Sequence, residues 1–535
     1  MVTVLLALAV TLGTPAVGER SVTTVDPRGE ARVEVAFQVP ISDIQQLWRP
    51  QDKVPFQDRK WWISFDSAPQ QDIPFISYFN LAERNRFLFG SESLEWDNRV
   101  ESKINQEKGV YEVRLTVVAG PDGRLTPFKV TLDRRDIPWT DALGEWRDGL
   151  SYPKGAYPDA AWKPVYCSWY AVHAAVTQDW TERTAAIASD LGFKTFILDD
   201  GWSYDEMKRV NPETIKTWYR DTGRWDAFSP VKFPDFRAHR ERMRKLGLKY
   251  IVWVAPYFVG TRSPAFVRWG FDKKDEKPFE GNVLADLRNA ALMDDITRQL
   301  TTLLRESDLD GLKIDFFDYI RASADNPQGA MSLAYIRRLM GELRKIKPEG
   351  IFEYRQSYAT PATAALATQF RAGDVPYEWL SNLQRICQIR LTMGDRIPVH
   401  ADPIYWSDVE ADENVDRHFM ASMAGVPMLS MDLEKMPKSR RDVVRAWLGY
   451  YTAHVERFHR GGTWRIDYRN GGLACATARL GDEALFIVND AAAFPKARAA
   501  ANVSKIVVLN LSFEELRLAD GTVIPAAGAY PARDK

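Results

Sequence analysis

Short apolar runs alternate with helical patterns eight times between about residue 160 and residue 435. The runs that we expect to form strands are Val165–Trp169, Thr195–Leu198, Lys249–Val254, Gly311–Phe316, Ile351–Tyr354, Gln369–Ala372, Ile397–His400 and Val426–Met431. Helical patterns lie between them, for example Trp180–Leu191, Phe236–Leu246, Leu292–Leu304, Leu333–Ile346, Leu380–Met393 and Val415–Met423. This alternation predicts an α/β chain with one closed (β/α)8 barrel, a TIM barrel. An open doubly wound sheet is the alternative, but it usually has a glycine-rich turn after its first strand, which this sequence lacks.

Segments of alternating polarity, typical of strands, flank the predicted barrel on both sides. Before it they are Ala31–Val39, Trp61–Phe65, Phe75–Phe79, Tyr111–Val118 and Phe128–Leu132. After it they are Thr463–Tyr468, Leu473–Ala478, Ala484–Val488 and Lys505–Leu509. We therefore expect an N-terminal β-sandwich over residues 19–155, the barrel over 156–460 and a small antiparallel β domain over 461–535.

The first residues, MVTVLLALAVTLGTPAVGER, hold an apolar run that is followed by small residues. Ala16-Val17-Gly18 is a plausible cleavage site, and the run is too short to span a bilayer. We expect residues 1–18 to be a signal peptide and the protein to be secreted or periplasmic. The alternatives are a mis-set start codon or a buried first strand.

Charge and the usage of cysteine and histidine narrow the range of partners. Lys and Arg number 71 against 72 Asp and Glu, a net charge of −1, so nucleic acid and anionic membranes are not expected as partners. Three cysteines cannot form a disulfide framework, and six histidines show no zinc-binding spacing. We expect neither metal nor cofactor. The sequence does not indicate the oligomeric state.

Carboxylates recur where the predicted barrel strands end, which is where the active site of such a barrel lies. Lys313 and Asp315 are two residues apart on one strand, so both side chains point to the same face, and the lysine keeps the aspartate ionised. A second carboxylate nearby would hold a proton, because negative charge raises its pKa. Paired carboxylates with tryptophans and no metal pattern favour glycoside hydrolysis. Single acids at strand ends are more often helix caps or ion-pair partners, and we interpret Asp402 and Asp432 in that way.

Five motifs in a fixed order carry a resemblance to a known family. They are Tyr166–Tyr170 (YCSWY), Phe196–Trp202 (FILDDGW), Gly223–Asp226 (GRWD) with Phe233-Pro234, Val252–Pro256 (VWVAP) and Leu312–Phe316 (LKIDF). Over roughly residues 160–435 the chain resembles the α-galactosidases of glycoside hydrolase family 36, the melibiase-like enzymes. The family's β-sandwich and C-terminal β domain match the expected organisation.

The resemblance implies a retaining exo-α-galactosidase that acts on α-galactoside oligosaccharides. Asp315, in the K-x-D motif, would be the nucleophile, and Asp374, after Arg371, the general acid/base. Asp199 and Asp200 would bind the O4 and O6 hydroxyls of the sugar. Further substrate-binding positions implied in the same way are Lys313, Arg371, Trp253, Trp169 and Arg355.

Two departures from the family leave alternatives open. Many members have a Cys or a glycine-rich segment after the fifth strand, where this chain has Glu353–Ser357 (EYRQS). That segment meets the C2 side of the sugar, so an α-N-acetylgalactosaminidase is an alternative, as is a raffinose-synthase-type galactosyl transferase. Arg371 and Asp374 are one residue closer than in some members.

Trp61, Trp62 and Trp96 are candidates for an aromatic residue that the N-terminal domain contributes. An inactive carbohydrate-binding protein is the alternative outside enzymes.

Overall fold

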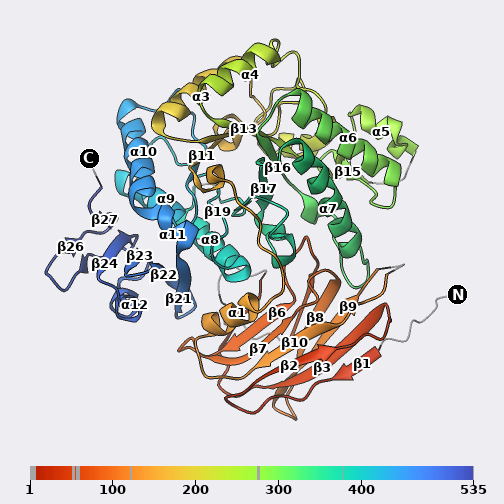
Figure 1. Cartoon of the computed structure of the whole chain (residues 1–535), viewed down its shortest axis with the longest axis vertical. Helices are drawn as coiled ribbons and strands as arrows, with labels where there is room; N and C mark the ends of the chain where they lie inside the picture. Colours follow the sequence, from red (N-terminus) through yellow and green to blue (C-terminus); the bar gives the residue numbers. More distant parts are fainter. Residues whose placement is uncertain are drawn as a thin grey trace.

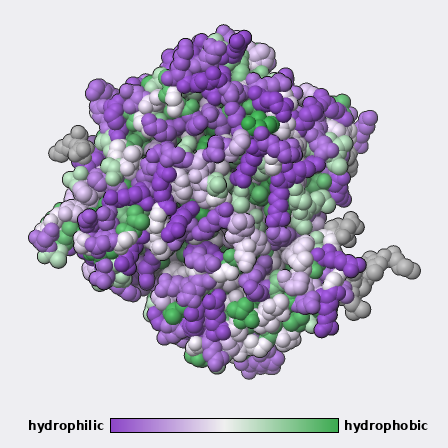
Figure 2. All heavy atoms as spheres, viewed as in Figure 1, coloured by the Kyte–Doolittle hydropathy of each residue, from purple (hydrophilic) through white to green (hydrophobic). Residues whose placement is uncertain are grey.

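The computed structural model describes residues 8–50, 55, 61–120, 123–273, 277–375 and 377–533. Figure 1 shows a β-sandwich, a barrel wrapped in helices and a smaller sheet beside the barrel helices. No helix within these ranges is long and apolar enough to cross a membrane. Figure 2 shows that hydrophilic side chains cover most of the visible face, with hydrophobic ones scattered between them.

The N-terminal sandwich consists of two five-stranded sheets. The first has the order β1 (Leu8–Thr11), β3 (Arg32–Pro40), β9 (Val110–Val118), β8 (Asp97–Asn105) and β5 (Trp62–Ser67). The second has the order β2 (Arg20–Val25), β10 (Phe128–Asp133), β7 (Asn85–Ser91), β6 (Phe75–Phe79) and β4 (Gln46–Trp48). Along β3, Val33, Val35 and Phe37 point into the core and alternate with more exposed residues, as expected for a sheet with one buried face.

Residues 8–11 lie within the segment predicted to be a signal peptide, and they form the edge strand β1, which pairs in parallel with β3. The other pairs of the sandwich are antiparallel. Residues 1–7 of the predicted signal peptide lie outside the described residues. The signal peptide and the export therefore stay predictions.

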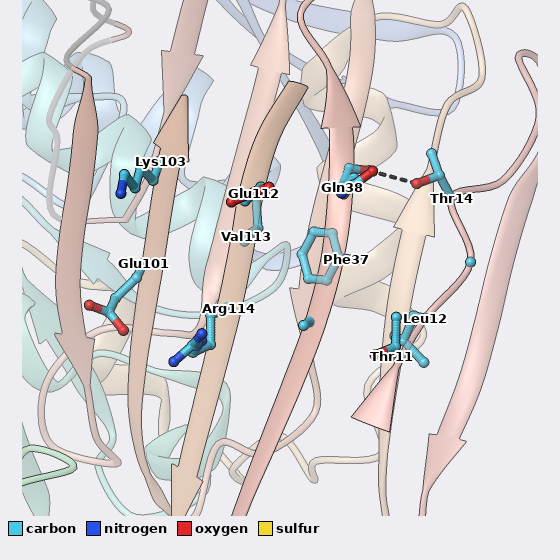
Figure 3. A pocket seen from close by; sticks show the side chains of 12 residues that line it. Thr11, Leu12, Thr14, Phe37, Gln38, Glu101, Lys103, Glu112, Val113 and Arg114 are labelled. Atoms are coloured by element: carbon cyan, nitrogen blue, oxygen red, sulfur yellow. Dashed lines mark hydrogen bonds between the residues drawn. The ribbon is translucent and has the colours of Figure 1, made fainter. Parts of the chain in front are cut away.

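A groove of about 720 Å³ crosses the outer face of the first sheet (Figure 3). Its charged side chains alternate in sign across the strands, since Glu101 lies opposite Arg114 and Lys103 opposite Glu112. Such cross-strand pairs stabilise a solvated sheet face. The groove lies on the sandwich, remote from the strand ends of the barrel.

The eight predicted barrel strands form one parallel sheet, which confirms the barrel. In chain order they are β11 (Val165–Cys167), β12 (Thr195–Leu198), β13 (Lys249–Val254), β16 (Gly311–Ile314), β17 (Ile351–Arg355), β18 (Gln369–Arg371), β19 (Val399–His400) and β20 (Met428–Leu429). A parallel bridge between His400 and Val426 closes the ring. Several strands are shorter than expected because their last residues turn outward into the loops that carry the polar side chains.

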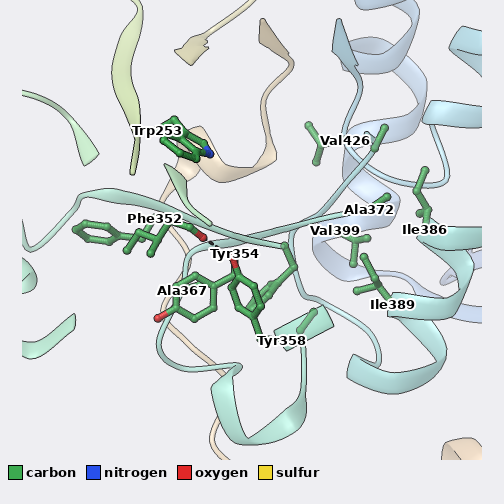
Figure 4. Close-up of a cluster of buried hydrophobic side chains, with 14 of the residues drawn as sticks. Trp253, Phe352, Tyr354, Tyr358, Ala367, Ala372, Ile386, Ile389, Val399 and Val426 are labelled. Carbon is green, nitrogen blue, oxygen red and sulfur yellow. Dashed lines mark hydrogen bonds between the residues drawn. The ribbon is translucent and has the colours of Figure 1, made fainter. Parts of the chain in front are cut away.

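Helices surround the barrel in the expected alternation. They are α2 (Trp169–Val172), α3 (Gln178–Leu191), α4 (Phe236–Lys245), α5 (Pro264–Arg268), α6 (Ala290–Glu306), α7 (Gly329–Ile346), α8 (Trp379–Met393), α9 (Asp412–Ser422), α10 (Lys438–Tyr450) and α11 (Glu456–Gly461). A small hairpin of β14 (Phe258–Gly260) and β15 (Asn282–Leu284) follows β13. Figure 4 shows part of the core between strands and helices, where Ile386 and Ile389 of α8 lie beside Val399.

The sandwich is joined to the barrel through α1 (Trp139–Asp148), a helix that the sequence pattern did not predict. Trp139 stacks on Phe79 of β6 at 4.8 Å between ring centroids, and Trp146 contacts Phe75 at 4.9 Å. Gly90 makes room for Trp146, because a Cβ there would lie 2.5 Å from its ring.

The C-terminal sheet has the order β21 (Thr463–Arg469), β22 (Gly472–Leu480), β23 (Glu483–Val488), β24 (Lys505–Asn510) and β27 (Gly528–Tyr530), with a separate pair β25 (Leu516–Arg517) and β26 (Val523–Ile524). It departs in one respect from the antiparallel sheet that we expected. β23 and β24 are parallel, because the alanine-rich helix α12 (Phe494–Ala501) crosses over between them.

Candidate active site

A cavity of about 40 Å³ lies at the ends of the barrel strands. It is lined by Trp169, Asp199, Asp200, Tyr219, Trp253, Lys313, Asp315, Phe316, Arg371, Asp374, Asp402 and Pro403. The structure thus brings together the predicted catalytic and substrate-binding residues around one space. Arg355, the remaining predicted residue, lines a neighbouring pocket and contacts two of the cavity residues.

Strand register explains why these residues meet. Trp253 pairs with Lys313, and Lys313 pairs with Glu353, so their side chains form one layer across β13, β16 and β17. One layer below, apolar side chains of Val165, Ile197, Ile251, Ile351 and Met428 fill the barrel. Residues beyond the polar layer, such as Asp315, therefore reach the mouth rather than the core.

The Asp315 carboxylate is buried and fixed by hydrogen bonds to both oxygens. Trp253 Nε1 donates to Oδ2 at 3.0 Å, and the Phe316 backbone N–H donates to Oδ1 at 3.1 Å. Phe316 adopts φ of +64°, a left-handed conformation that is uncommon for a bulky residue and places this N–H beside the carboxylate.

Asp374 lies on the other side of the cavity and is about half exposed. Arg371 Nη1 donates to its Oδ1 at 2.8 Å, and Arg355 Nη2 donates to its Oδ2 at 2.7 Å. Burial would raise the pKa of Asp374, but the charges of Arg355 and Arg371 outweigh it and hold the pKa well below its usual range. In the ligand-free site this carboxyl group is therefore ionised.

The Arg355 guanidinium lies between the two carboxylates. Besides Asp374, it faces Asp315, with Nη1 at 3.6 Å from Oδ1, and it covers the Phe316 ring at 5.1 Å. Asp315 and Asp374 therefore flank one guanidinium group.

Asp199 and Asp200 follow β12 and have different partners. Lys313 Nζ donates to Asp199 Oδ2 at 2.6 Å, and both side chains are buried. Burial opposes the charge of Lys313, yet the Asp199 carboxylate holds the lysine pKa above its usual value.

Asp200 Oδ2 accepts hydrogen bonds from Trp218 Nε1 at 2.7 Å and from the Tyr204 hydroxyl at 3.1 Å. Burial raises the pKa of Asp200 to about 6, against the lowering effect of Lys208 and of the Trp218 hydrogen bond. Its charge therefore changes close to neutral pH.

The sequence interpretation missed the aromatic residues of the long loop after β12. Tyr204, Trp218 and Tyr219 are buried there, and Tyr219 lies nearly parallel to the Trp253 ring with centroids 6.3 Å apart. The sequence of this loop shows neither a strand period nor a helix period. The excess of aromatic residues between Trp202 and Trp225 was therefore the only feature of the sequence that could have indicated them.

Asp402 was interpreted from sequence as a cap or ion-pair partner. It is fully buried, lines the cavity and binds Arg371. Asp432 pairs with Lys435 at 2.7 Å, in agreement with the simpler interpretation. Glu378 caps α8 by accepting from the Leu380 N–H at 3.1 Å.

A second pocket of about 430 Å³ adjoins Asp374 on the side of the sandwich. The barrel contributes Arg355, Gln356, Arg385 and Gln388 to its lining, and the sandwich contributes Pro50, Asp72 and Ile73. Trp61, Trp62 and Trp96 do not line it. Which aromatic residue of the N-terminal domain contacts a bound sugar stays open.

Comparisons with known proteins find α-galactosidases. Alpha-galactosidase 2 of Pediococcus pentosaceus is 27% identical over 353 residues, which are 59% of this chain and 45% of that protein. The GH36 α-galactosidase AgaA of Geobacillus stearothermophilus superimposes with a TM-score of 0.64 over 86% of this chain and 69% of that chain, at 15% identity. The chain resembles the α-galactosidases of glycoside hydrolase family 36.

A further solved α-galactosidase is covered almost over its whole length. TtGalA of Thermus thermophilus superimposes with a TM-score of 0.58 over 85% of this chain and 95% of that chain, at 18% identity. No protein-family profile matches the chain. The chain matches less than half of the length of its curated relatives. At these identities the structural likeness establishes the fold.

Proposed function

We propose that the protein is a retaining exo-α-galactosidase that releases terminal α-galactosyl residues from oligosaccharides. The observation that carries the proposal is the pair of carboxylates on either side of Arg355, because a glycosidic bond placed between them would be within reach of both. AgaA has been solved in complex with raffinose and with stachyose, and TtGalA with p-nitrophenyl α-D-galactopyranoside. These sugars indicate the substrate class to test first.

In the first step, Asp315 attacks the anomeric carbon while the bond from that carbon to the leaving oxygen breaks. Asp374 gives its proton to the leaving oxygen, and the sugar becomes bound to Asp315 as an ester. In the second step, Asp374 takes a proton from water, the water oxygen bonds to the anomeric carbon, and Asp315 is released. The hydrogen bonds from Trp253 and the Phe316 N–H aim Asp315 at the sugar.

Arg355 lies between the two carboxylates, where a glycosidic bond within reach of both would have to lie, so it moves aside when a sugar binds. The cavity of about 40 Å³ is far smaller than ligand pockets, which are roughly 300–1,000 Å³. Arg355 also lines the adjoining pocket of about 430 Å³, which offers space for its displaced side chain and for the leaving sugar. When Arg355 leaves, Asp374 loses one of its two cations, so binding favours the protonated acid that the first step needs.

The two carboxylates can be separated experimentally by their roles. Asp315→Ala removes the nucleophile, so all substrates should lose at least about 10⁴-fold in kcat. Asp374→Ala should retain the first step on an aryl α-galactoside whose phenol is acidic, because that leaving group needs no donated proton. Azide should then accelerate turnover and yield α-galactosyl azide. Asp432→Ala, at the end of another strand, is the matched control and should keep wild-type rates.

If Asp374→Ala with azide is as inactive as Asp315→Ala, the acid/base is another residue.

The anomer formed first is an independent check of the double displacement. Two displacements at one carbon give the α-anomer, so NMR that detects the β-anomer first would contradict the double displacement.

A further inference from the structure

Two carboxylates compete for one nitrogen of Arg371. Nη1 donates to Asp374 Oδ1 at 2.8 Å, to the Ala372 carbonyl at 2.9 Å and also to Asp402 Oδ1. Arg371 is almost completely buried, so this charge cannot be shared with water instead. The more strongly the Asp402 carboxylate interacts with Arg371, the less the positive charge of Arg371 acts on Asp374.

Asp402 is held in place from several sides. Its Oδ2 accepts from the Tyr170 hydroxyl at 3.0 Å and from the Val375 backbone N–H at 2.7 Å. Its own backbone N–H and carbonyl bind the side-chain amide of Asn382 on α8 at 3.0 and 2.9 Å. Since Val375 directly follows Asp374, Asp402 also anchors the loop that carries Asp374.

The ionisable groups that face Asp402 come from four places. They are Arg371 on β18, Asp374 in the loop after β18, Tyr170 on α2 and Arg385 on α8. Burial raises the pKa of Asp402 to about 7, against the lowering effect of Arg371. The ionised Asp374 also contributes to this rise, so a proton on Asp374 lowers the pKa of Asp402 and favours its ionised form.

We propose that Asp402 is a positioning residue that draws Arg371 partly away from Asp374 and so allows Asp374 to take up the proton it must donate. The inference rests on the proposed role of Asp374 as acid/base. When a substrate displaces Arg355, Arg371 still donates to Asp374 and keeps it ionised, and Lys313 adds a smaller effect in the same direction on its pKa. The negative charge of Asp402 offsets that cation and favours the protonated form of Asp374.

The test is the pH dependence of kcat, which reports the acid in the enzyme–substrate complex, where Arg355 has been displaced. In Asp402→Asn the amide no longer offsets Arg371, so Asp374 protonates only at lower pH. On raffinose, whose leaving group needs a proton, the basic limb should move down by about one pH unit, which is about a tenfold loss on that limb. On an aryl α-galactoside with an acidic phenol, the loss should be under about threefold.

Two further variants keep the test decisive. Tyr170→Phe removes one hydrogen bond to the Asp402 carboxylate, so it should move the basic limb in the same direction by a smaller amount. Asp432→Asn, another aspartate at a strand end, should not move it. If Asp402→Asn does not fold, the outcome with Tyr170→Phe decides.

Three results would overturn the inference: an unmoved basic limb in both variants, a shift to higher pH, or equal losses on both substrates, which would indicate a purely structural role. Failure of the proposed function gives a different pattern. In that case the wild type cleaves neither substrate, or azide does not rescue Asp374→Ala.

Discussion

Asp199 and Asp200 are neighbours in the chain, yet their side chains have different partners. Asp199 is paired with the buried ammonium group of Lys313. Among the described residues, Asp200 accepts from two neutral donors, Trp218 Nε1 and the Tyr204 hydroxyl. If these carboxylates bind hydroxyl groups of the sugar, the pH dependence of substrate binding should follow Asp200.

We expect KM for an aryl α-galactoside to rise as the pH falls below about 6, because the protonated Asp200 accepts hydrogen bonds from hydroxyl groups less well. Tyr204→Phe removes a donor to the ionised form, which raises the pKa of Asp200 further and moves the rise in KM to higher pH. The measurement is KM between pH 4.5 and 8 for the wild type and the variant.

Tyr450→Phe is the control for this series, since the Tyr450 hydroxyl is buried without a hydrogen-bond partner among the described residues. It should leave the KM profile unchanged. A Tyr204→Phe profile that coincides with the wild type would remove Asp200 from substrate binding.

Within the barrel sheet, the closest approach of two strands depends on Gly311 at the start of β16. A Cβ at this position would lie 1.8 Å from the Ile351 carbonyl oxygen of β17, a backbone atom that cannot turn aside. The side-chain layer above it, with Lys313 and Glu353, depends on this pairing.

Gly311→Ala should therefore force β16 and β17 apart and lower the free energy of unfolding by more than about 3 kcal/mol. Gly341→Ala is a matched control, because Gly341 is an exposed glycine of α7, and a Cβ there would have no neighbouring atom of the described residues within 4 Å. It should be neutral or stabilising by up to about 1 kcal/mol. Urea denaturation measures both, and equal stability of the two variants would contradict the steric argument.

The elements that could be predicted from sequence are those with a strong period. Each barrel strand is an apolar run such as Lys249–Val254, and α6 and α7 show a clear helical period. The order of these strands and helices along the chain was therefore sufficient to predict the barrel. The residues at strand ends were found because K-x-D spacing and adjacent aspartates are local patterns. Trp218 and Tyr219 were missed because the folding of a long loop brings them to the site. No local period in the sequence predicts this position. The significance of Asp402 depends on its distance from Arg371, which the sequence does not contain.

At the scale of the whole molecule, the sandwich stabilises the barrel through a buried carboxylate. Asp97 of β8 accepts hydrogen bonds from the Gly329 N–H at 2.9 and 3.1 Å, at the start of α7. The residue that precedes α7, Gln328, makes no side-chain cap of its own. Gly329 permits this contact, because a Cβ there would lie 2.8 Å from Asp97 Oδ1.

Asp97→Ala should lower the free energy of unfolding by about 1–3 kcal/mol, because it leaves a buried helix N-terminus without its cap. Asp325→Ala is the control. Asp325 joins the same two parts of the molecule by an exposed ion pair with Arg99, which is worth at most about 1 kcal/mol. Equal effects of the two substitutions in thermal denaturation would contradict the capping role.

The same carboxylate makes the stability depend on pH. Burial raises the pKa of Asp97 to about 7, above the value of 3.8 that it has when exposed. The folded state therefore binds more protons between about pH 4 and 7, and the stability due to this group falls as the pH rises through that window. Asp97→Asn should remove this dependence, so the free energy of unfolding of the wild type relative to the variant should fall between pH 5 and pH 7.5.

The capping of α7 by Asp97 also has a consequence for how the chain acquires its structure during synthesis. The ribosome delivers the sandwich first, and domains generally fold as units in that order. Asp97 is thus in position more than two hundred residues before Gly329 emerges. A barrel expressed without the sandwich would begin α7 with unsatisfied amides. The N-terminal part therefore acts as a template on which α7 of the nascent barrel is completed.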